Sequence, residues 1–143
     1  MGEVEITTDK SRVDVDVVHR YLSESSYWAQ DRSRETVERS VRHSLCFSVF
    51  ADNEQIGFAR VVSDHAVFAY LMDVFVVPEF RGRGISKALM RAVLDHPELQ
   101  NLRLFLLRTS DAHGLYEQFG FRPVANPESL MAIQNPDSDK HSS

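Results

Sequence analysis

Two glycines, Gly82 and Gly84, stand where a long apolar run gives way to a helical pattern. The run from Ala66 to Val77 contains one charge, Asp73, and predicts a strand covered on both faces of a sheet. Apolar residues then recur with the spacing of one helical face, at Ile85, Ala88, Leu89, Ala92 and Val93. A helix start exposes unpaired backbone N–H groups and the positive end of its dipole, so this stretch predicts an anion site for a phosphate or pyrophosphate.

The neighbouring cations favour this interpretation, although a simpler one stays open. Arg83, Lys87 and Arg91 recur every four residues and therefore share one helix face. Such a row of cations is also typical of a solvated face, and two glycines can serve only to let the chain turn. Neither G-x-G-x-x-G nor G-x-x-x-x-G-K-[ST] is present.

Two motifs carry a family resemblance. The stretch Arg81-Gly-Arg-Gly-Ile-Ser86 resembles the acyl-CoA-binding motif Q/R-x-x-G-x-G/A of the GNAT N-acetyltransferases, with Ser86 where that family usually has Gly or Ala. The stretch Leu115-Tyr-Glu-Gln-Phe-Gly-Phe121 resembles the family's L-Y-x-x-x-G-F segment. Together they cover roughly Asp73 to Pro123. The resemblance implies an enzyme that moves acetyl from acetyl-CoA to an amine by direct attack in a ternary complex.

The resemblance also implies which residues meet acetyl-CoA. The backbone of Phe75, Val76 and Val77 is expected to pair with the pantetheine arm. The backbone N–H groups of the glycine turn are expected to hold the pyrophosphate, at Arg81, Gly82, Arg83, Gly84, Ile85, Ser86 and Lys87. Tyr116 matches the family's tyrosine, which donates a proton to the departing thiolate. A phenol with a pKa of about 10 is protonated at neutral pH and suits that role, whereas a tyrosine on a short amphipathic helix could equally be a core residue.

The base that accepts the amine proton is not evident. Asp73 is an isolated carboxylate among apolar residues, and burial would raise its pKa. It could instead pair with an arginine or a backbone turn. His113 lies three residues before Tyr116 and shares its helix face. Because many members of the family use a water relay, neither residue is assigned as the base.

The resemblance implies that the acceptor side is formed by the first two helices, their connecting loop and the last strands, which here means the segment from Ser23 to Arg34. Tyr27, Trp28 and Arg32 are expected to line an acceptor pocket, with Arg32 holding a carboxylate. Asp73 is a further substrate-binding candidate. Alternatively, the two aromatic rings pin this loop to the core. The acceptor, a small-molecule or peptide amine, is left open.

Composition sets the broad class. The chain has 143 residues, 43% apolar and 26% charged, with a net charge of −5. We expect one domain over residues 1–134 and a disordered polar tail over 135–143. The acidic balance argues against a nucleic-acid partner, and no apolar stretch is long enough for a bilayer. The N-terminus lacks a signal pattern, so a cytoplasmic location is expected.

Cysteine and histidine usage adds little chemistry. The single cysteine, Cys46, excludes an internal disulfide framework and reads as a small buried hydrophobe, not as a nucleophile. The six histidines show no paired spacing, so no metal site is expected.

The remaining pattern predicts an α/β (α+β) fold with a mixed, mostly antiparallel twisted sheet and helices on both faces. Strands are expected at Glu3–Thr8, Cys46–Ala51, Ile56–Ser63, Ala66–Val77, Leu102–Leu107, Phe121–Pro123 and Leu130–Ile133. Helices are expected from Ser11 to Leu22, from Arg34 to Ser44, from Gly84 to just before His96 and from Ala112 to Phe119. For the first of them, Val13, Val15 and Val17 fit a strand equally well. The resemblance adds a splay between the fourth and fifth strands, where the pantetheine arm would lie.

Two other functions fit the same residues. One is a CoA-binding sensor or pseudoenzyme, which the missing base keeps open. The other is a domain that meets another protein through its first two helices. Homodimers are frequent in the family, although no residue in the sequence identifies an interface.

Overall fold

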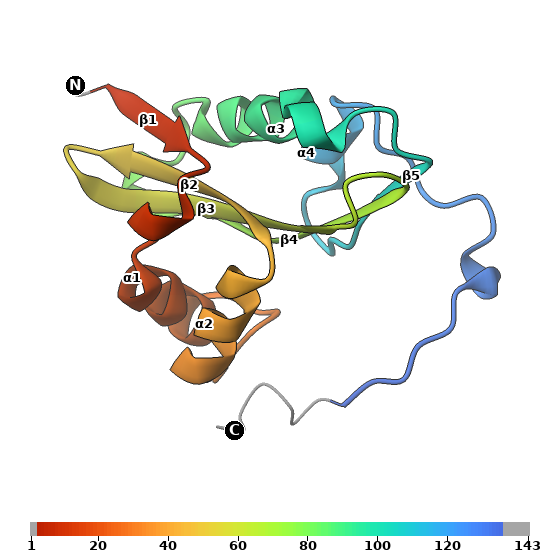
Figure 1. The fold of residues 1–143 in the computed structure, drawn as a ribbon, viewed down its shortest axis with the longest axis horizontal. Coiled ribbons are helices and arrows are strands. Elements are labelled where there is room, and N and C mark those ends of the chain that lie inside the picture. Colours follow the sequence, from red (N-terminus) through yellow and green to blue (C-terminus); the bar gives the residue numbers. More distant parts are fainter. Residues whose placement is uncertain (1–2, 136–143) are drawn as a thin grey trace.

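The computed structural model describes residues 3–135 and shows one five-stranded sheet in that range (Figure 1). Its strands follow in sequence order: β1 (Val4–Thr7), β2 (Leu45–Ala51), β3 (Glu54–Ser63), β4 (Phe68–Val76) and β5 (Leu104–Leu107). Neighbouring strands from β1 to β4 are antiparallel, whereas β5 runs parallel to β4. The predicted mixed, mostly antiparallel sheet is confirmed.

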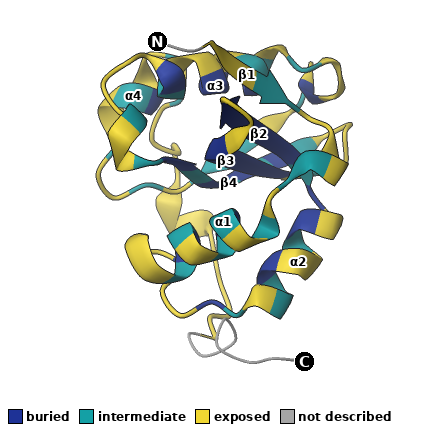
Figure 2. Ribbon diagram, turned by 90° about the vertical axis from the view of Figure 1, so that its left-hand side faces the viewer, coloured by how far each residue is buried: buried dark blue, intermediate teal, exposed yellow. Residues whose placement is uncertain are grey.

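Helices cover both faces of this sheet, as the sequence predicted (Figures 1 and 2). One face carries α1 (Val15–Arg20) and α2 (Arg34–Arg42), and the other carries α3 (Ile85–Asp95) and α4 (His113–Glu117). Each face has its own buried apolar cluster against the sheet. The strands between the two layers are the most deeply buried part of the chain (Figure 2).

The strand β4 has two unlike halves. From Phe68 to Leu71 it pairs with β5 on one side and β3 on the other, ending at the pair Leu71 with Leu107. From Met72 to Val76 it pairs with β3 alone among the described residues. The predicted splay between the fourth and fifth strands is therefore present and opens after Leu71.

A β-bulge lies where the splay opens. The register between β3 and β4 shifts between Phe58 and Arg60, which leaves one extra residue on β4. Asp73 sits at this point with a φ of +55°, in the left-handed region that an aspartate seldom adopts. A backbone of this kind is held only where the surrounding contacts fix it.

The first helix differs from its prediction. It was expected to begin at Ser11, but α1 is capped by Asp14, whose side chain accepts the backbone N–H of Val17 at 3.2 Å. Ser11 belongs to a separate 3₁₀ turn. The helix continues beyond α1 as a π-helical turn, Tyr21–Ser25, which leads into the loop predicted to carry the acceptor side.

The two strands predicted after α4 are absent from the described chain. Neither Phe121–Pro123 nor Leu130–Ile133 forms a strand, so both predictions were wrong. Phe121 packs edge-on against the Phe105 ring, with ring centres 5.6 Å apart. The chain after it is exposed, holds one short 3₁₀ turn, Pro127–Ser129, and runs away from the body (Figure 1). An apolar stretch becomes a strand only beside a partner strand, and neither stretch pairs with a strand among residues 3–135.

Two predictions concern the ends of the chain. The disordered tail expected over 135–143 lies, apart from Asn135, outside the described residues. The single domain expected over residues 1–134 stays a prediction. Within residues 3–135, no helix is both long and apolar enough to cross a bilayer.

Candidate functional site

The glycine turn before α3 leaves open space in front of its backbone. Gly82 and Gly84 both have a φ of +78°, a conformation that side chains rarely adopt. A Cβ atom added to either glycine would meet no other atom within 4 Å. The need for glycine is therefore conformational, and a ligand has room to approach this backbone.

The start of α3 points unpaired donors into that space. Gly84 is the N-cap, and the first intrahelical bond runs from the Ala88 N–H to the Gly84 carbonyl at 3.1 Å. The N–H groups of Ile85, Ser86 and Lys87 have no acceptor inside the helix by construction. Together with the helix dipole they suit an anion, and the anion site itself stays a prediction.

The side chain of Arg81 holds the glycine turn in place through hydrogen bonds within the protein. Its Nε donates to the Val76 carbonyl at 2.9 Å, and a terminal nitrogen donates to the Tyr21 hydroxyl at 2.6 Å. The Tyr21 ring in turn stacks on Phe75, with ring centres 4.0 Å apart. Arg81 thus ties the turn to the end of β4, while the Arg83 guanidinium lies over the Phe80 ring at 5.0 Å.

The open half of β4 presents backbone groups to the gap. The Val77 N–H donates to the Ile56 carbonyl of β3 at 2.8 Å. Successive residues of a strand direct their backbone groups to opposite edges, so Val76 faces away from β3. The bond from Arg81 to the Val76 carbonyl agrees with that direction. Of the three residues predicted to pair with the pantetheine arm, Val76 faces the gap, and Phe75 and Val77 face β3.

A buried ion cluster fixes the bulge at Asp73. The Asp73 side chain is 1% exposed, and Arg60 Nε donates to its Oδ2 at 2.8 Å. Arg32 donates to both carboxylate oxygens, at 3.2 and 3.1 Å, and Trp28 Nε1 donates to Oδ1 at 2.9 Å. The cluster joins the loop after α1 to β3 and β4. It supplies the contacts that hold the left-handed backbone of Asp73 in place.

This cluster bears on the search for a base. Both oxygens of Asp73 already accept hydrogen bonds from guanidinium groups. A proton taken from an amine would break one of these ion pairs, so the arrangement disfavours Asp73 as the proton acceptor. Of the two alternatives open from the sequence, pairing with an arginine is the one found. Trp28 also holds its loop against the core through this bond, in line with the alternative to a pocket-lining role.

A cavity of about 590 Å³ lies in the splay beside the bulge. It brings together every residue predicted for the acceptor side and the predicted acid, namely Tyr27, Trp28, Arg32, Asp73 and Tyr116. Tyr27 closes the cavity from one side, because its hydroxyl accepts the Ser110 N–H at 3.3 Å and donates to Asp111 at 3.4 Å. The loop after α1 and the loop after β5 therefore meet across the gap.

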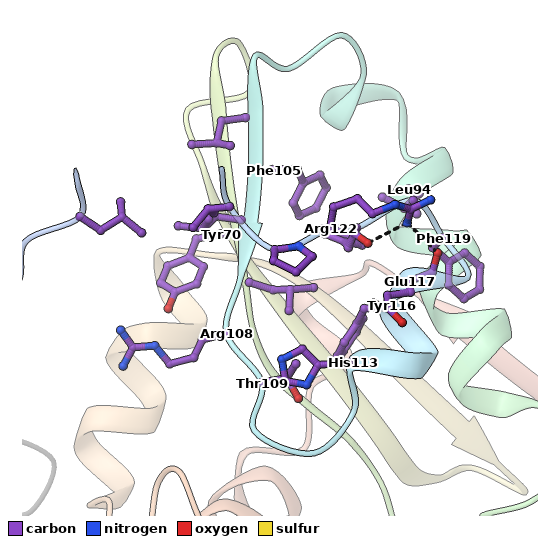
Figure 3. Close-up of a pocket in the computed structure, with 18 residues that line it drawn as sticks. Tyr70, Leu94, Phe105, Arg108, Thr109, His113, Tyr116, Glu117, Phe119 and Arg122 are labelled. Atoms are coloured by element: carbon purple, nitrogen blue, oxygen red, sulfur yellow. Dashed lines mark hydrogen bonds between the residues drawn. The ribbon is translucent and has the colours of Figure 1, made fainter. Parts of the chain in front are cut away.

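Tyr116 stands in the wall of this cavity on α4. Burial raises its pKa to about 12, and the nearby Tyr27 and Asp111 add to the shift. Its ring meets the Phe121 ring edge-on at 6.1 Å between centres. The phenol therefore keeps its proton at neutral pH, which is the state that a general acid needs. His113 lies on the same helix and lines the neighbouring cavity (Figure 3).

Several lining residues escaped the sequence interpretation. Tyr70 and Arg108 both border the cavity, and Asp111 holds Tyr27. Arg108 and Asp111 could have been predicted from the polar run that directly follows the apolar strand β5, since loops at strand ends often carry binding residues. The role of Tyr21 could not be predicted from the sequence, because its hydrogen bond with Arg81 joins residues that are far apart along the chain.

Two other chemistries find no support in the described residues. Cys46 is buried, and burial raises the pKa of its thiol to about 11, which disfavours a thiolate nucleophile. Within residues 3–135, no group of three or more His, Cys, Asp or Glu side chains is placed to hold a metal ion.

Comparison with known proteins decides the family. The family model described as an acetyltransferase (GNAT) domain matches residues 42–123, which include the open half of β4, the glycine turn and Tyr116. This chain belongs to the GNAT acetyltransferase family. The resemblance seen in the sequence is thereby confirmed.

Individual GNAT relatives agree. The uncharacterized N-acetyltransferase ycf52 of Porphyra purpurea is 30% identical over 78% of this chain and 66% of its own. A GNAT-family protein from Xanthomonas campestris pv. campestris, whose crystal structure is known, is 53% identical to this chain. The two structures superpose with a TM-score of 0.94 over 99% of both chains. An acetyltransferase of Clostridium acetobutylicum, solved with acetyl-CoA, shares the fold at 16% identity, with a TM-score of 0.67 over 94% of this chain and 96% of its own.

Proposed function

We propose that this GNAT chain is an N-acetyltransferase that uses acetyl-CoA as its cosubstrate and acetylates an amine. The observation that carries the proposal is the continuity of three features. The open edge of β4 at Val76 leads to the glycine turn at one end and to the cavity with Tyr116 at the other. Acetyl-CoA is elongated in the same order: its diphosphate suits the turn, its amide-bearing arm suits the strand edge, and its thioester would reach the cavity.

The proposed binding mode follows the geometry. The diphosphate lies against the N–H groups of residues 82–87, where the helix dipole and open space favour it. The Arg81 N–H, which was expected to take part, already donates to the Pro78 carbonyl at 3.2 Å. The pantetheine amides pair with the outward backbone groups of Val76 and, by the same alternation, of Val74. This places the thioester near the cavity at the bulge. Support also comes from the acetyl-CoA complex of the Clostridium acetobutylicum acetyltransferase, which shares this fold.

The proposed reaction is direct transfer. The amine nitrogen attacks the thioester carbonyl, and a backbone N–H of the open half of β4 stabilises the oxyanion. The C–S bond then breaks, and Tyr116 gives its phenolic proton to the leaving thiolate. The amine proton passes to water, because Asp73 is occupied by Arg32 and Arg60. Water returns a proton to Tyr116 before the next turnover.

The acceptor side has mixed character. Tyr27, Trp28 and Tyr70 offer aromatic surface, and Arg108 offers a cation at the cavity wall. Arg32 was expected to hold an acceptor carboxylate, but its guanidinium already binds Asp73. We therefore assign carboxylate recognition, where the acceptor has such a group, to Arg108. A small-molecule or peptide amine fits the cavity of about 590 Å³.

Turnover of Tyr116→Phe tests the proposal. We expect kcat to fall by roughly 10²- to 10⁴-fold, the usual contribution of a general acid, with the dissociation constant for acetyl-CoA unchanged. Free-thiol release across an amine panel gives the rate, and calorimetry gives the affinity. Tyr27→Phe is the matched control, since it removes the same atom from the same cavity. It should chiefly raise KM for the acceptor, because the Tyr27 hydroxyl bonds to Ser110 and Asp111.

Two results would overturn this assignment. If Tyr116→Phe kept the kcat of the natural chain, Tyr116 would not be the general acid. Saturable acetyl-CoA binding without thiol release from any amine would instead favour the CoA-binding sensor.

A further inference from the structure

Arg108 is an exposed cation at the wall of the acceptor cavity, and its guanidinium binds no oxygen among residues 3–135. The other charges of the cavity are already engaged. Asp73 is paired with buried guanidinium groups, and Asp111 accepts a hydrogen bond from the Tyr27 hydroxyl at 3.4 Å. An arginine whose donors are not used within the protein can hold a carboxylate through two parallel hydrogen bonds.

The alternation of side chains along a strand places Arg108 on the same face of the sheet as Tyr70. Tyr70 of β4 is paired with Leu106 of β5, and Arg108 follows directly after the end of that strand. Phe105 and Leu107 pack against the cluster under α3, so they lie on the opposite face. Figure 3 shows the Tyr70 hydroxyl and the Arg108 guanidinium on one side of the two strands and Phe105 on the other. Both polar groups can therefore reach the same ligand.

Asp111 adds the opposite charge in the same loop after β5. It lies close to Tyr116, because both line the cavity and the Asp111 charge adds to the rise in the pKa of that phenol. In the proposed reaction the amine reaches the thioester at Tyr116, so an ammonium group that arrives there is attracted by Asp111. A polyamine would bring further ammonium groups toward Arg108, whereas a molecule with one ammonium and one carboxylate meets a matching charge at each end.

The loop after α1 supplies apolar surface to the same cavity. The rings of Tyr27 and Trp28 meet edge-on, with centres 5.1 Å apart, and both line the cavity. They remain 55% and 37% exposed, so part of each ring is open to a ligand. Because Trp28 Nε1 is bonded to Asp73, its ring is held in one orientation. A fixed aromatic wall favours a flat or apolar group on the ligand.

We propose that the acceptor is a free amino acid with an apolar or aromatic side chain. Its carboxylate binds the Arg108 guanidinium, with the Tyr70 hydroxyl as a second donor. Its ammonium group lies beside Asp111, and its side chain packs on Tyr27 and Trp28. This assignment rests on the proposed function, because it names the amine that the same site acetylates.

The charge of the amino acid changes during the reaction. The ammonium group first gives one proton to water, and the neutral nitrogen then attacks the thioester carbonyl. As the C–N bond replaces the C–S bond, a second proton passes from nitrogen to water and Tyr116 protonates the thiolate. The N-acetyl amino acid keeps its carboxylate but has lost the positive charge that Asp111 attracts. The product is therefore expected to bind more weakly than the amino acid.

Rates of free-thiol release across matched acceptors test the substrate class. Phenylalanine, tyrosine and leucine are each compared with their amide and with their decarboxylated amine, which keep the side chain and the amine but lack the carboxylate. We expect the best amino acid to exceed both of its analogues in kcat/KM by roughly 10- to 100-fold, the usual contribution of hydrogen bonds to a charged group. Spermidine represents the polyamines and should be the poorer acceptor.

Arg108→Gln tests the residue that reads the carboxylate. It should remove most of the preference by lowering kcat/KM for the amino acid, while the rate with the decarboxylated amine stays unchanged. Arg108→Lys keeps the charge but loses the two parallel donors, so it should restore part of the preference. Arg103→Gln is the matched control, since Arg103 is an exposed arginine next to β5 that lies outside the lining of the cavity, and it should keep the full preference.

The results separate this assignment from the proposed function. Equal kcat/KM for the amino acids and their decarboxylated amines would overturn the amino-acid assignment and leave the N-acetyltransferase intact. A preference for the amino acid that survives in Arg108→Gln would overturn the role of Arg108. Acetyl-CoA binding without thiol release from any acceptor of the panel would overturn both proposals.

Discussion

The two halves of β4 differ in what they leave unpaired. From Phe68 to Leu71 the strand has a neighbour on each side, and its backbone groups are used within the sheet. From Met72 to Val76 it has one neighbour among the described residues, and the outward groups face the splay. One strand thus serves as scaffold in its first half and as ligand surface in its second.

The bulge at Asp73 marks the change between the halves. The buried ion cluster there is unfavourable in two respects, because the Asp73 backbone is strained and the charges of Asp73, Arg32 and Arg60 are desolvated. In return, it holds the open half of β4 in place without a second neighbouring strand. An unpaired strand edge can therefore be kept in place by side chains from other elements of the chain. Three predictions test this difference, beginning with the largest effect.

Asp73→Ala should destabilise the protein strongly. Removing the carboxylate leaves Arg32 and Arg60 buried without their shared partner, and loss of one member of a buried ion pair costs roughly 3–5 kcal/mol. Chemical denaturation should show the loss as a lower midpoint. Asp95→Ala, at the exposed end of α3, is the control and should shift the free energy of unfolding by no more than about 0.5 kcal/mol. Equal effects from both variants would refute the role given to the cluster.

Gly84→Glu should weaken acetyl-CoA binding by at least about 100-fold. The new side chain brings negative charge to the proposed diphosphate site, where like charges cost several kcal/mol. Gly120→Glu is matched, because Gly120 also has a positive φ, +97°, and open space around its Cβ position. Both variants place a side chain at a positive φ, so calorimetry separates this backbone strain from the effect of charge at the turn. Comparable affinity in the two variants would move the diphosphate away from the turn.

The pH dependence should show the smallest effect. Burial raises the folded pKa of Tyr116 to about 12, above the value of about 10 in an unfolded chain. The resulting stabilisation is full below pH 10 and is lost as the pH rises from about 10 to about 12. Tyr116 should therefore stay protonated between pH 7 and 10, and the turnover rate should not fall in this range through loss of its proton. A basic limb near pH 9 that vanishes in Tyr116→Phe would contradict this.

The parts of the fold that follow local rules were predictable from the sequence. The hairpins of β2, β3 and β4 come from apolar runs broken by turn residues, and α3 begins where Gly84 predicts. The last predicted strand failed for a physical reason. The pattern of Leu130–Ile133 favours a strand, but pairing depends on a neighbour, and the sequence does not say which edge is available.

The site divides in the same way. The glycine turn was predictable because all of its parts lie within a few consecutive residues. The cluster at Asp73 was not, because Arg32 and Arg60 reach it from other elements, 41 and 13 residues away. The left-handed backbone of Asp73 was equally hidden, since Gly and Asn are the residues that usually signal that conformation.

Backbone hydrogen exchange with and without acetyl-CoA tests most directly the claim that the open half of β4 and the glycine turn form one ligand surface. Residue-resolved NMR would report each amide. With saturating acetyl-CoA, we expect slower exchange at Val74, Val76 and residues 84–87, and no change at Phe68–Leu71, which are already paired on both sides. Unchanged exchange at Val76 and in the turn, or protection that falls equally on both halves of β4, would contradict the account.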